Sequence, residues 1–177
     1  ACRKHFTGTA SFGVVQNPND AAFPGTITAG VLRAGPGTIH MPLAIFGTTQ
    51  TYAFLGARTQ FAITDTAIAA GSKLCGAIAK TEIDTRMFPA IHAKAQATVA
   101  AECTAPAQPD CGCPSGSQGR TYINLWDVNP KDCALSLDEV RDSSLMQALF
   151  APDVVIDGVQ AISYGEAITA VNAATEA

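Results

Sequence analysis

The densest group of side chains that could do chemistry lies between residues 127 and 139, which read Asp-Val-Asn-Pro-Lys-Asp-Cys-Ala-Leu-Ser-Leu-Asp-Glu. The EF-hand calcium loop follows the pattern D-x-[DN]-x-[DN]-G-x5-E, whose oxygen ligands suit a hard cation and whose last glutamate opens a helix. One inserted residue near Pro130 brings the candidate ligands into the same order. These ligands are Asp127, Asn129, Asp132 and Glu139. Calcium is therefore the candidate cofactor.

This segment departs from the calcium loop in two ways. Without the insertion, Lys131 takes the third ligand position, and a cation cannot ligate calcium. Cys133 stands where the loop has glycine, and cysteine lacks glycine's freedom at a sharp turn. The alternative is an acidic turn in which Ser136 and Glu139 form the capping box of a following helix. Both interpretations predict a helix directly after Ser136.

The chain contains six cysteines, which are Cys2, Cys75, Cys103, Cys111, Cys113 and Cys133. Zinc sites usually pair cysteines as C-x(2–4)-C, with a second pair or two histidines at matching spacing. Here one residue separates Cys111 from Cys113, and no histidine lies nearby in the sequence. Disulfides formed in an oxidising compartment are therefore favoured over zinc. Of the 15 possible connectivities, we expect a staple among the four clustered cysteines, which leaves Cys2 to pair with Cys75.

Catalytic patterns are weaker than the metal-like and cysteine patterns. Ser115 and Ser117 lie in Pro-Ser-Gly-Ser-Gln-Gly, which is not the G-x-S-x-G nucleophile elbow. His40 lies in a strand-like run and His92 on a predicted helix, so only the tertiary fold could bring either beside a carboxylate. We assign no catalytic residue and favour a non-enzymatic protein. A secreted hydrolase with a histidine–carboxylate site is an alternative.

The elements that must position these residues begin with a β-rich part, residues 1–78. Short runs rich in Thr, Val, Ile and Phe are separated by Gly, Pro and Asn, with turns about every 8–12 residues. This spacing predicts an antiparallel sandwich or barrel rather than alternating strands and helices. The expected strands are 6–15, 26–33, 38–46, 51–55, 58–64 and 72–78.

Residues 79–103 change to a helical period. Thr81-Glu82-Ile83-Asp84 resembles a capping box, and Pro89 is expected in the first turn of a second helix. An apolar stripe formed by Ile91, Ala95 and Thr98–Val99 follows at helical spacing.

The remaining chain is a long loop followed by mixed structure. Residues 104–119 form a Cys-, Pro- and Gly-containing loop, which disulfides would hold in place. In residues 120–177 we expect a strand at 120–126, a helix at 136–150 and a closing strand at 161–171. The whole chain, residues 1–177, is expected to form one domain.

Composition excludes several classes of protein. Apolar residues make up 47% of the chain, as in globular proteins, but charged residues only 15%. With a net charge of −4 and scattered cations, the electrostatic footprint of a nucleic-acid binder is missing. No run reaches the roughly 18 apolar residues of a membrane span. Cys2 follows a small residue, as at the acylation site of bacterial lipoproteins, so a lipid anchor at Cys2 is an alternative to its disulfide.

Several segments resemble a group of known proteins. Residues 74–83 (Leu-Cys-Gly-Ala-Ile-Ala-Lys-Thr-Glu-Ile) are similar to the strand and helix that end the group's β-rich half. The Cys-Gly-Cys at 111–113, the Asp-rich Cys turn with S-x-x-E at 127–139, the segment 144–159 and the strand end at 169–171 follow in the group's order. The group consists of uncharacterised exported, often lipoprotein-like, disulfide-containing proteins of myxobacteria and related soil bacteria.

The resemblance implies export and a β-rich fold, and it implies no activity. In that group the segment after Pro152 often continues as D-x-D-x-D-G, which looks calcium-binding, but here Val155 replaces one ligand.

Together these patterns predict an antiparallel β-sandwich with two or three packed helices and a disulfide-stapled loop. We expect a secreted or cell-surface structural or binding protein, and one version of it is a homo-oligomer or a subunit of an extracellular assembly. A calcium-stabilised adhesion module and the secreted hydrolase are the alternatives.

Overall fold

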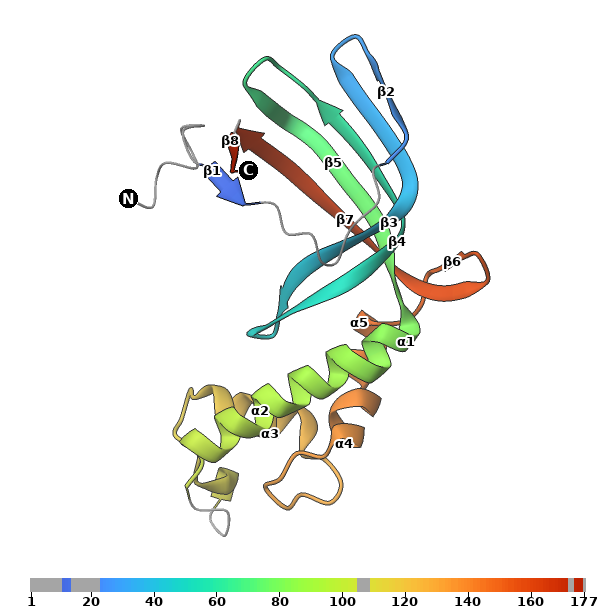
Figure 1. Ribbon diagram of the computed structural model, residues 1–177. Coiled ribbons are helices and arrows are strands. Elements are labelled where there is room, and N and C mark those ends of the chain that lie inside the picture. Colours follow the sequence, from blue (N-terminus) through green and yellow to red (C-terminus); the bar gives the residue numbers. More distant parts are fainter. Residues whose placement is uncertain (1–10, 14–22, 105–108, 172–173, 177) are drawn as a thin grey trace. The chain divides into compact units, whose positions relative to one another are not determined.

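A computed structural model describes residues 11–13, 23–104, 109–171 and 174–176 (Figure 1). The chain divides into two compact units. The first contains Ala1–Met41, Ala53–Ala79 and Asp153–Ala177, and the second contains Pro42–Tyr52 and Lys80–Pro152. Cys2 and His5 lie outside the described residues. The lipid anchor at Cys2 and the Cys2–Cys75 disulfide, both predicted from the sequence, therefore lie outside them as well.

A curled, six-stranded antiparallel sheet dominates the first unit, with strand order β2-β3-β4-β5-β7-β6 (Figure 1). Its strands are β2 (Gly25–Thr28), β3 (Val31–Ile45), β4 (Thr48–Ala62), β5 (Ala67–Ala79), β6 (Val154–Ile156) and β7 (Val159–Val171). Two further short strands, β1 (Ser11–Gly13) and β8 (Ala174–Glu176), pair in parallel. The mainly antiparallel β fold is confirmed. The large sheet is a single one, however, so the sandwich is not confirmed.

The observed strand boundaries differ from the predicted ones at three places, and two of these involve a glycine inside a strand. A break was expected around Gly35, but β3 runs through it. A Cβ at Gly35 would lie 2.3 Å from the Ala57 carbonyl oxygen, so this glycine permits a close approach of neighbouring strands rather than a turn. Likewise β4 continues through Gly56, where the register with β5 shifts. The expected strand 26–33 instead turns at Ala29, because β2 and β3 form a hairpin there.

Phe54 anchors the core of the first unit. Its side chain is fully buried, and its ring meets that of Tyr164 edge to face at 5.1 Å between centroids. Gly76 leaves room for this ring, since a Cβ at Gly76 would lie 3.3 Å from Phe54 Cδ1. Strands β4, β5 and β7 therefore share one packed face. Among the described residues, no helix is long and apolar enough to cross a membrane.

Apart from Pro42–Tyr52, which contains the end of β3 and the start of β4, the second unit is helical. After α1 (Lys80–Glu82) and a π-helical segment (Ile83–Met87), its helices are α2 (Phe88–Glu102), α3 (Gln118–Trp126), α4 (Leu137–Asp142) and α5 (Ser144–Leu149). Pro89 lies in the first turn of α2, as predicted, and the stripe containing Ile91 and Ala95 is buried. The predicted capping box at Thr81 is wrong because the helix already begins at Lys80.

The predicted strand at 120–126 is also wrong, because these residues form α3. The Ser117 hydroxyl accepts a hydrogen bond from the Arg120 N–H at 3.2 Å and caps the helix. Ile123 and Trp126 are buried, and α3 packs against α2. The predicted helix 136–150 is present as two helices, since the extended backbone of Ser143 separates α4 from α5.

Candidate functional site

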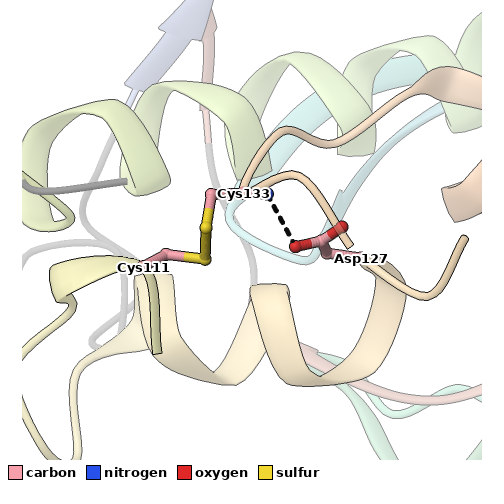
Figure 2. Close-up of side chains that lie close together, drawn as sticks. All are labelled: Cys111, Asp127 and Cys133. Atoms are coloured by element: carbon pink, nitrogen blue, oxygen red, sulfur yellow. Dashed lines mark hydrogen bonds between the residues drawn. A yellow bond between two sulfur atoms is a disulfide. The ribbon is translucent and has the colours of Figure 1, made fainter. Parts of the chain in front are cut away.

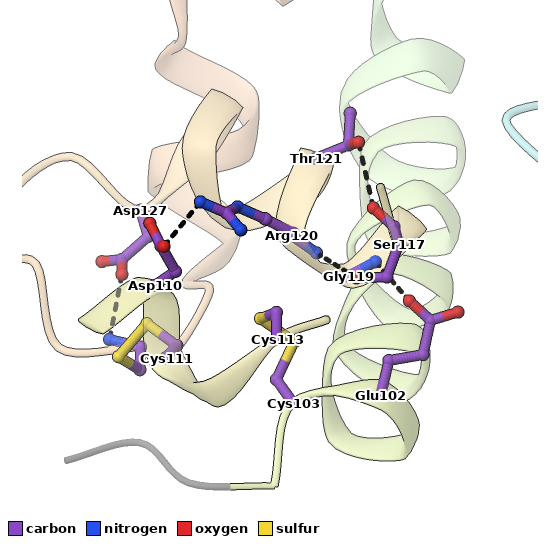
Figure 3. The surroundings of a disulfide bond; sticks show 11 residues. Glu102, Cys103, Asp110, Cys111, Cys113, Ser117, Gly119, Arg120, Thr121 and Asp127 are labelled. Atoms are coloured by element: carbon purple, nitrogen blue, oxygen red, sulfur yellow. Dashed lines mark hydrogen bonds and ion pairs between the residues drawn. A yellow bond between two sulfur atoms is a disulfide. The ribbon is translucent and has the colours of Figure 1, made fainter. Parts of the chain in front are cut away.

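Two disulfides hold the centre of the second unit (Figure 3). Cys103 follows the last residue of α2 and is bonded to Cys113, while Cys111 is bonded to Cys133 beyond α3. The expected staple among these four cysteines is confirmed. By loop-closure entropy, each bridge stabilises the folded chain by roughly 3 kcal/mol. The staple therefore fixes a loop that has little apolar core of its own.

The stapled loop contains backbone conformations that need such support. Asp110 and Cys111, in the 3-10 turn Pro109–Gly112, both have positive φ, at 56° and 59°. L-residues in this left-handed region each cost roughly 1–2 kcal/mol. The carboxylate of Asp110 also forms an ion pair, at 2.5 Å, with the guanidinium group of Arg120 in α3. Cross-links and ion pair together hold the turn against α3.

Close packing joins the end of α2 to the start of α3. The Glu102 carboxylate accepts a hydrogen bond from the Gly119 N–H at 2.6 Å, so a negative charge lies at the N-terminus of α3 (Figure 3). A Cβ at Gly119 would lie 2.8 Å from Cys103 Sγ. This contact requires a glycine at the first turn of α3.

Asp127, the first predicted calcium ligand, ends α3 and is buried. Its carboxylate accepts a hydrogen bond from the backbone N–H of Cys133 at 2.9 Å (Figure 2). It also accepts one from the backbone N–H of Asp132 at 3.1 Å. Cys133 has a φ of 66°, so the sharp turn expected at the glycine position of the calcium loop does exist. The disulfide to Cys111 and the hydrogen bond that the Cys133 N–H donates to Asp127 hold Cys133 in this conformation.

Asp127 and the disulfide sulfurs of Cys111 and Cys133 form a compact cluster. Within the described residues, this is the one group of three His, Cys, Asp or Glu side chains whose ligand atoms lie within 4.8 Å of one another. Metal ions bind cysteine as the thiolate, and both sulfurs are bonded to each other. In the oxidised protein, only the carboxylate of this cluster could act as a metal ligand.

Glu139 closes the capping box predicted from the sequence. Its carboxylate accepts hydrogen bonds from the Ser136 N–H at 2.9 Å and the Ser136 hydroxyl at 2.8 Å, while the Ser136 hydroxyl accepts from the Glu139 N–H. The Asn129 N–H also approaches Glu139, at 3.4 Å. Partial burial raises the pKa of Glu139, but these hydrogen bonds outweigh it and hold the pKa below its ordinary value.

The four predicted calcium ligands therefore lie on one loop without converging on a common point. Asp127, Asp132 and Glu139 each accept backbone N–H groups, and Asp132 does so from Ala134 at 3.0 Å. The arrangement matches the alternative interpretation, an acidic turn before a capped helix. In this arrangement the side-chain oxygens of the four residues do not fit a calcium site. Calcium binding stays a prediction.

An open groove of about 570 Å³ lies beside the staple. One side is the exposed, alanine-rich face of α2, and the other is formed by Leu135, Ala134 and the disulfide cysteines. The Leu135 carbonyl accepts hydrogen bonds from His92 Nε2 at 2.7 Å and Gln96 Nε2 at 3.0 Å, which hold this loop along α2. His92 thus has a structural role here. His40 lies exposed on β3.

The segment after Pro152, whose resemblance to a calcium loop is interrupted at Val155, lies in the β-hairpin formed by β6 and β7. Asp157 and Gly158 make the turn between β6 and β7, with φ values of 49° and 81°. Asp153 accepts hydrogen bonds from both the backbone N–H and the hydroxyl of Ser163, and these bonds lower its pKa.

Comparison with protein-family models, with curated proteins and with solved structures found no match for this chain.

Proposed function

We propose that this protein is a non-enzymatic, exported structural or binding protein whose copies associate by adding strands at the outer edge of β7. Disulfides are typical of oxidising compartments such as the cell exterior. Cys103, Cys111, Cys113 and Cys133 are all paired, which supports export. The association rests on one observation, the long edge of the sheet at β7.

Among the described residues, strand β7 is paired along most of one side and along only a short part of the other. Its pairing with β5 extends from Ala161 to Val171, but β6 covers only Val159 to Ala161 on the other side. Beyond Ala161, the backbone N–H of Ser163 donates a hydrogen bond to the carboxylate of Asp153. Among the described residues, no strand pairs with the outer side of β7 after Ser163.

The open part of β7 presents backbone groups in the pattern that a further strand needs. Asp153 N–H donates to the Ala161 carbonyl, so odd-numbered residues direct their N–H and C=O groups outward. By this alternation, Gly165 and Ala167 direct their N–H and C=O groups outward, where no described strand pairs with them. Natural edge strands are usually protected by charged side chains, proline or bulges. From residue 164 to 170, Glu166 is the single charged residue.

The edge strands also expose apolar side chains. Ile27 of β2 is 66% exposed and Val155 of β6 is 65% exposed. Since small neutral residues flank the open edge, a second copy can approach closely and form main-chain hydrogen bonds. Pairing of identical edges would give a closed dimer, whereas pairing of different edges would extend to a filament.

The test is sedimentation equilibrium of unreduced protein over a wide concentration range, comparing wild type with Ala167→Pro. Proline removes the outward N–H and blocks an incoming strand, but it leaves the hydrogen bonds to β5 intact. We expect self-association in the wild type, weakened about tenfold or more by the proline. The matched control, Ala167→Ser, keeps the N–H and should associate as wild type does. A wild type that stays monomeric throughout would refute the proposal.

A further inference from the structure

Cationic side chains from three adjacent strands meet on one face of the first unit's sheet. The strand register places Arg58 opposite Cys75 and Gln60 opposite Lys73. Because alternate residues of a strand share a face, these four side chains lie on the same side of the sheet. Arg33 joins them from β3, the neighbour of β4. All five line a pocket of about 340 Å³, which we name the cationic pocket.

Two glycines lie in or beside the cationic pocket. Gly35 forms part of its lining, and the Ala57 carbonyl leaves no space for a Cβ there. On the other flank, Gly165 lies opposite Cys75 in β7, and a Cβ at Gly165 would have no atom within 4 Å. Among the described residues, the space at Gly165 beside Cys75 is therefore open.

The three cations have no acidic partner among the described residues. Four other lysines and arginines do form ion pairs, namely Lys80, Arg86, Arg120 and Arg141. The nearest acid on β7, Glu166, pairs with Leu74, so it lies on the opposite face from Cys75. In a chain whose net charge is −4, the pocket thus concentrates positive charge that no described acidic residue pairs with. Such a concentration attracts anions.

We propose that the cationic pocket binds a small oxyanion that carries two negative charges, such as a phosphate or sulfate group. The planar guanidinium groups of Arg33 and Arg58 can each donate two parallel hydrogen bonds to such a group, and Lys73 adds a compact charge. The pocket volume lies at the lower end of the range for small-molecule sites, which favours a compact anion over a large organic ligand.

Isothermal titration calorimetry with sodium phosphate and with sodium sulfate, at pH 7.5 and constant ionic strength in chloride, tests this binding. We expect saturable binding that Arg58→Gln weakens about tenfold or more, because one charge-assisted bidentate contact is lost. The double variant Arg33→Gln/Lys73→Gln should bind more weakly still. The control Lys94→Gln/Lys131→Gln changes the net charge equally, by two, outside the pocket and should bind as wild type does.

The outcomes separate clearly. Binding of one of the two oxyanions alone, with the same variant pattern, would assign the pocket to that anion. No saturable binding of either anion would overturn the proposal. Pocket and control variants that weaken binding equally would do so as well, because a general charge effect would then explain the result.

Cys75 provides a second readout inside the pocket. In a Cys2→Ser chain with both described disulfides intact, Cys75 is the one free thiol, and it is exposed. Positive potential should favour anionic iodoacetate over neutral iodoacetamide at Cys75 by several-fold, compared with free cysteine. Phosphate should slow the alkylation, and Arg33→Gln/Lys73→Gln should abolish the preference. An unchanged preference in that variant would overturn the electrostatic assignment.

Discussion

Replacement of Asp127 by alanine discriminates between a hydrogen-bonding role and a calcium-binding role for this carboxylate. Asp127 is 5% exposed and accepts two backbone N–H groups, from Asp132 and Cys133. Hydrogen bonds to a charged acceptor each contribute about 1.5–3 kcal/mol, and partial access of water to the freed N–H groups recovers some of this. We expect Asp127→Ala to lower the free energy of unfolding by about 2–4 kcal/mol. For a chain of this size, that corresponds to roughly 5–15 °C in Tm.

The assay is thermal and urea unfolding of the unreduced protein, in excess calcium and in chelator. Because the hydrogen bonds do not depend on a metal, the loss should be equal under both conditions. Asp127→Asn, which keeps one oxygen acceptor, should lose less. Asp138→Ala serves as the surface control, since Asp138 is exposed and its ion pair with Arg141 lies at the surface. A loss below about 0.5 kcal/mol, or a loss confined to calcium-containing buffer, would refute this reasoning.

Three further predictions concern the staple, the remaining cysteines and acid. Replacing both Cys111 and Cys133 by serine should lower stability by about 3 kcal/mol, as measured by urea unfolding. Peptide mapping of unreduced protein should recover Cys2 and Cys75 in one disulfide-linked fragment. Because hydrogen bonds from Ser163 lower the pKa of Asp153, its contribution is present above the unfolded pKa and is lost as the pH falls through the folded pKa. Asp153→Asn should therefore flatten the acid side of the stability profile.

Each of these three predictions can fail separately. A double serine variant as stable as the wild type would remove the staple's role in stability. Separate Cys2 and Cys75 peptides, or an acyl group on Cys2, would exclude the disulfide. An Asp153→Asn variant with the acid profile of the wild type would show that its carboxylate forms no such bonds in solution.

Local signals in the sequence predicted the start of α2 and the cap of α4 correctly, but they predicted a strand where α3 lies. The capping box of Ser136 and Glu139 spans four residues and needs no distant partner, so it was predictable, as was Pro89 at the start of α2. Residues 120–126 carry β-branched and aromatic side chains that favour a strand. The cap at Ser117 and the burial of Ile123 overrode that preference, and tertiary packing rather than propensity decided α3.

By itself, the sequence determined the class of this protein: mainly β, with a helical part after residue 79 and a staple among four clustered cysteines. These features depend on composition, period and short spacing. Only the tertiary structure decided that β2 to β7 form one sheet, and that Arg33, Arg58 and Lys73 share one pocket. It also decided that no described strand pairs with the outer side of β7 after Ser163. In the sequence these three cations look scattered. Their meeting depends on the register between strands, which long-range hydrogen bonds and the packing of one face determine.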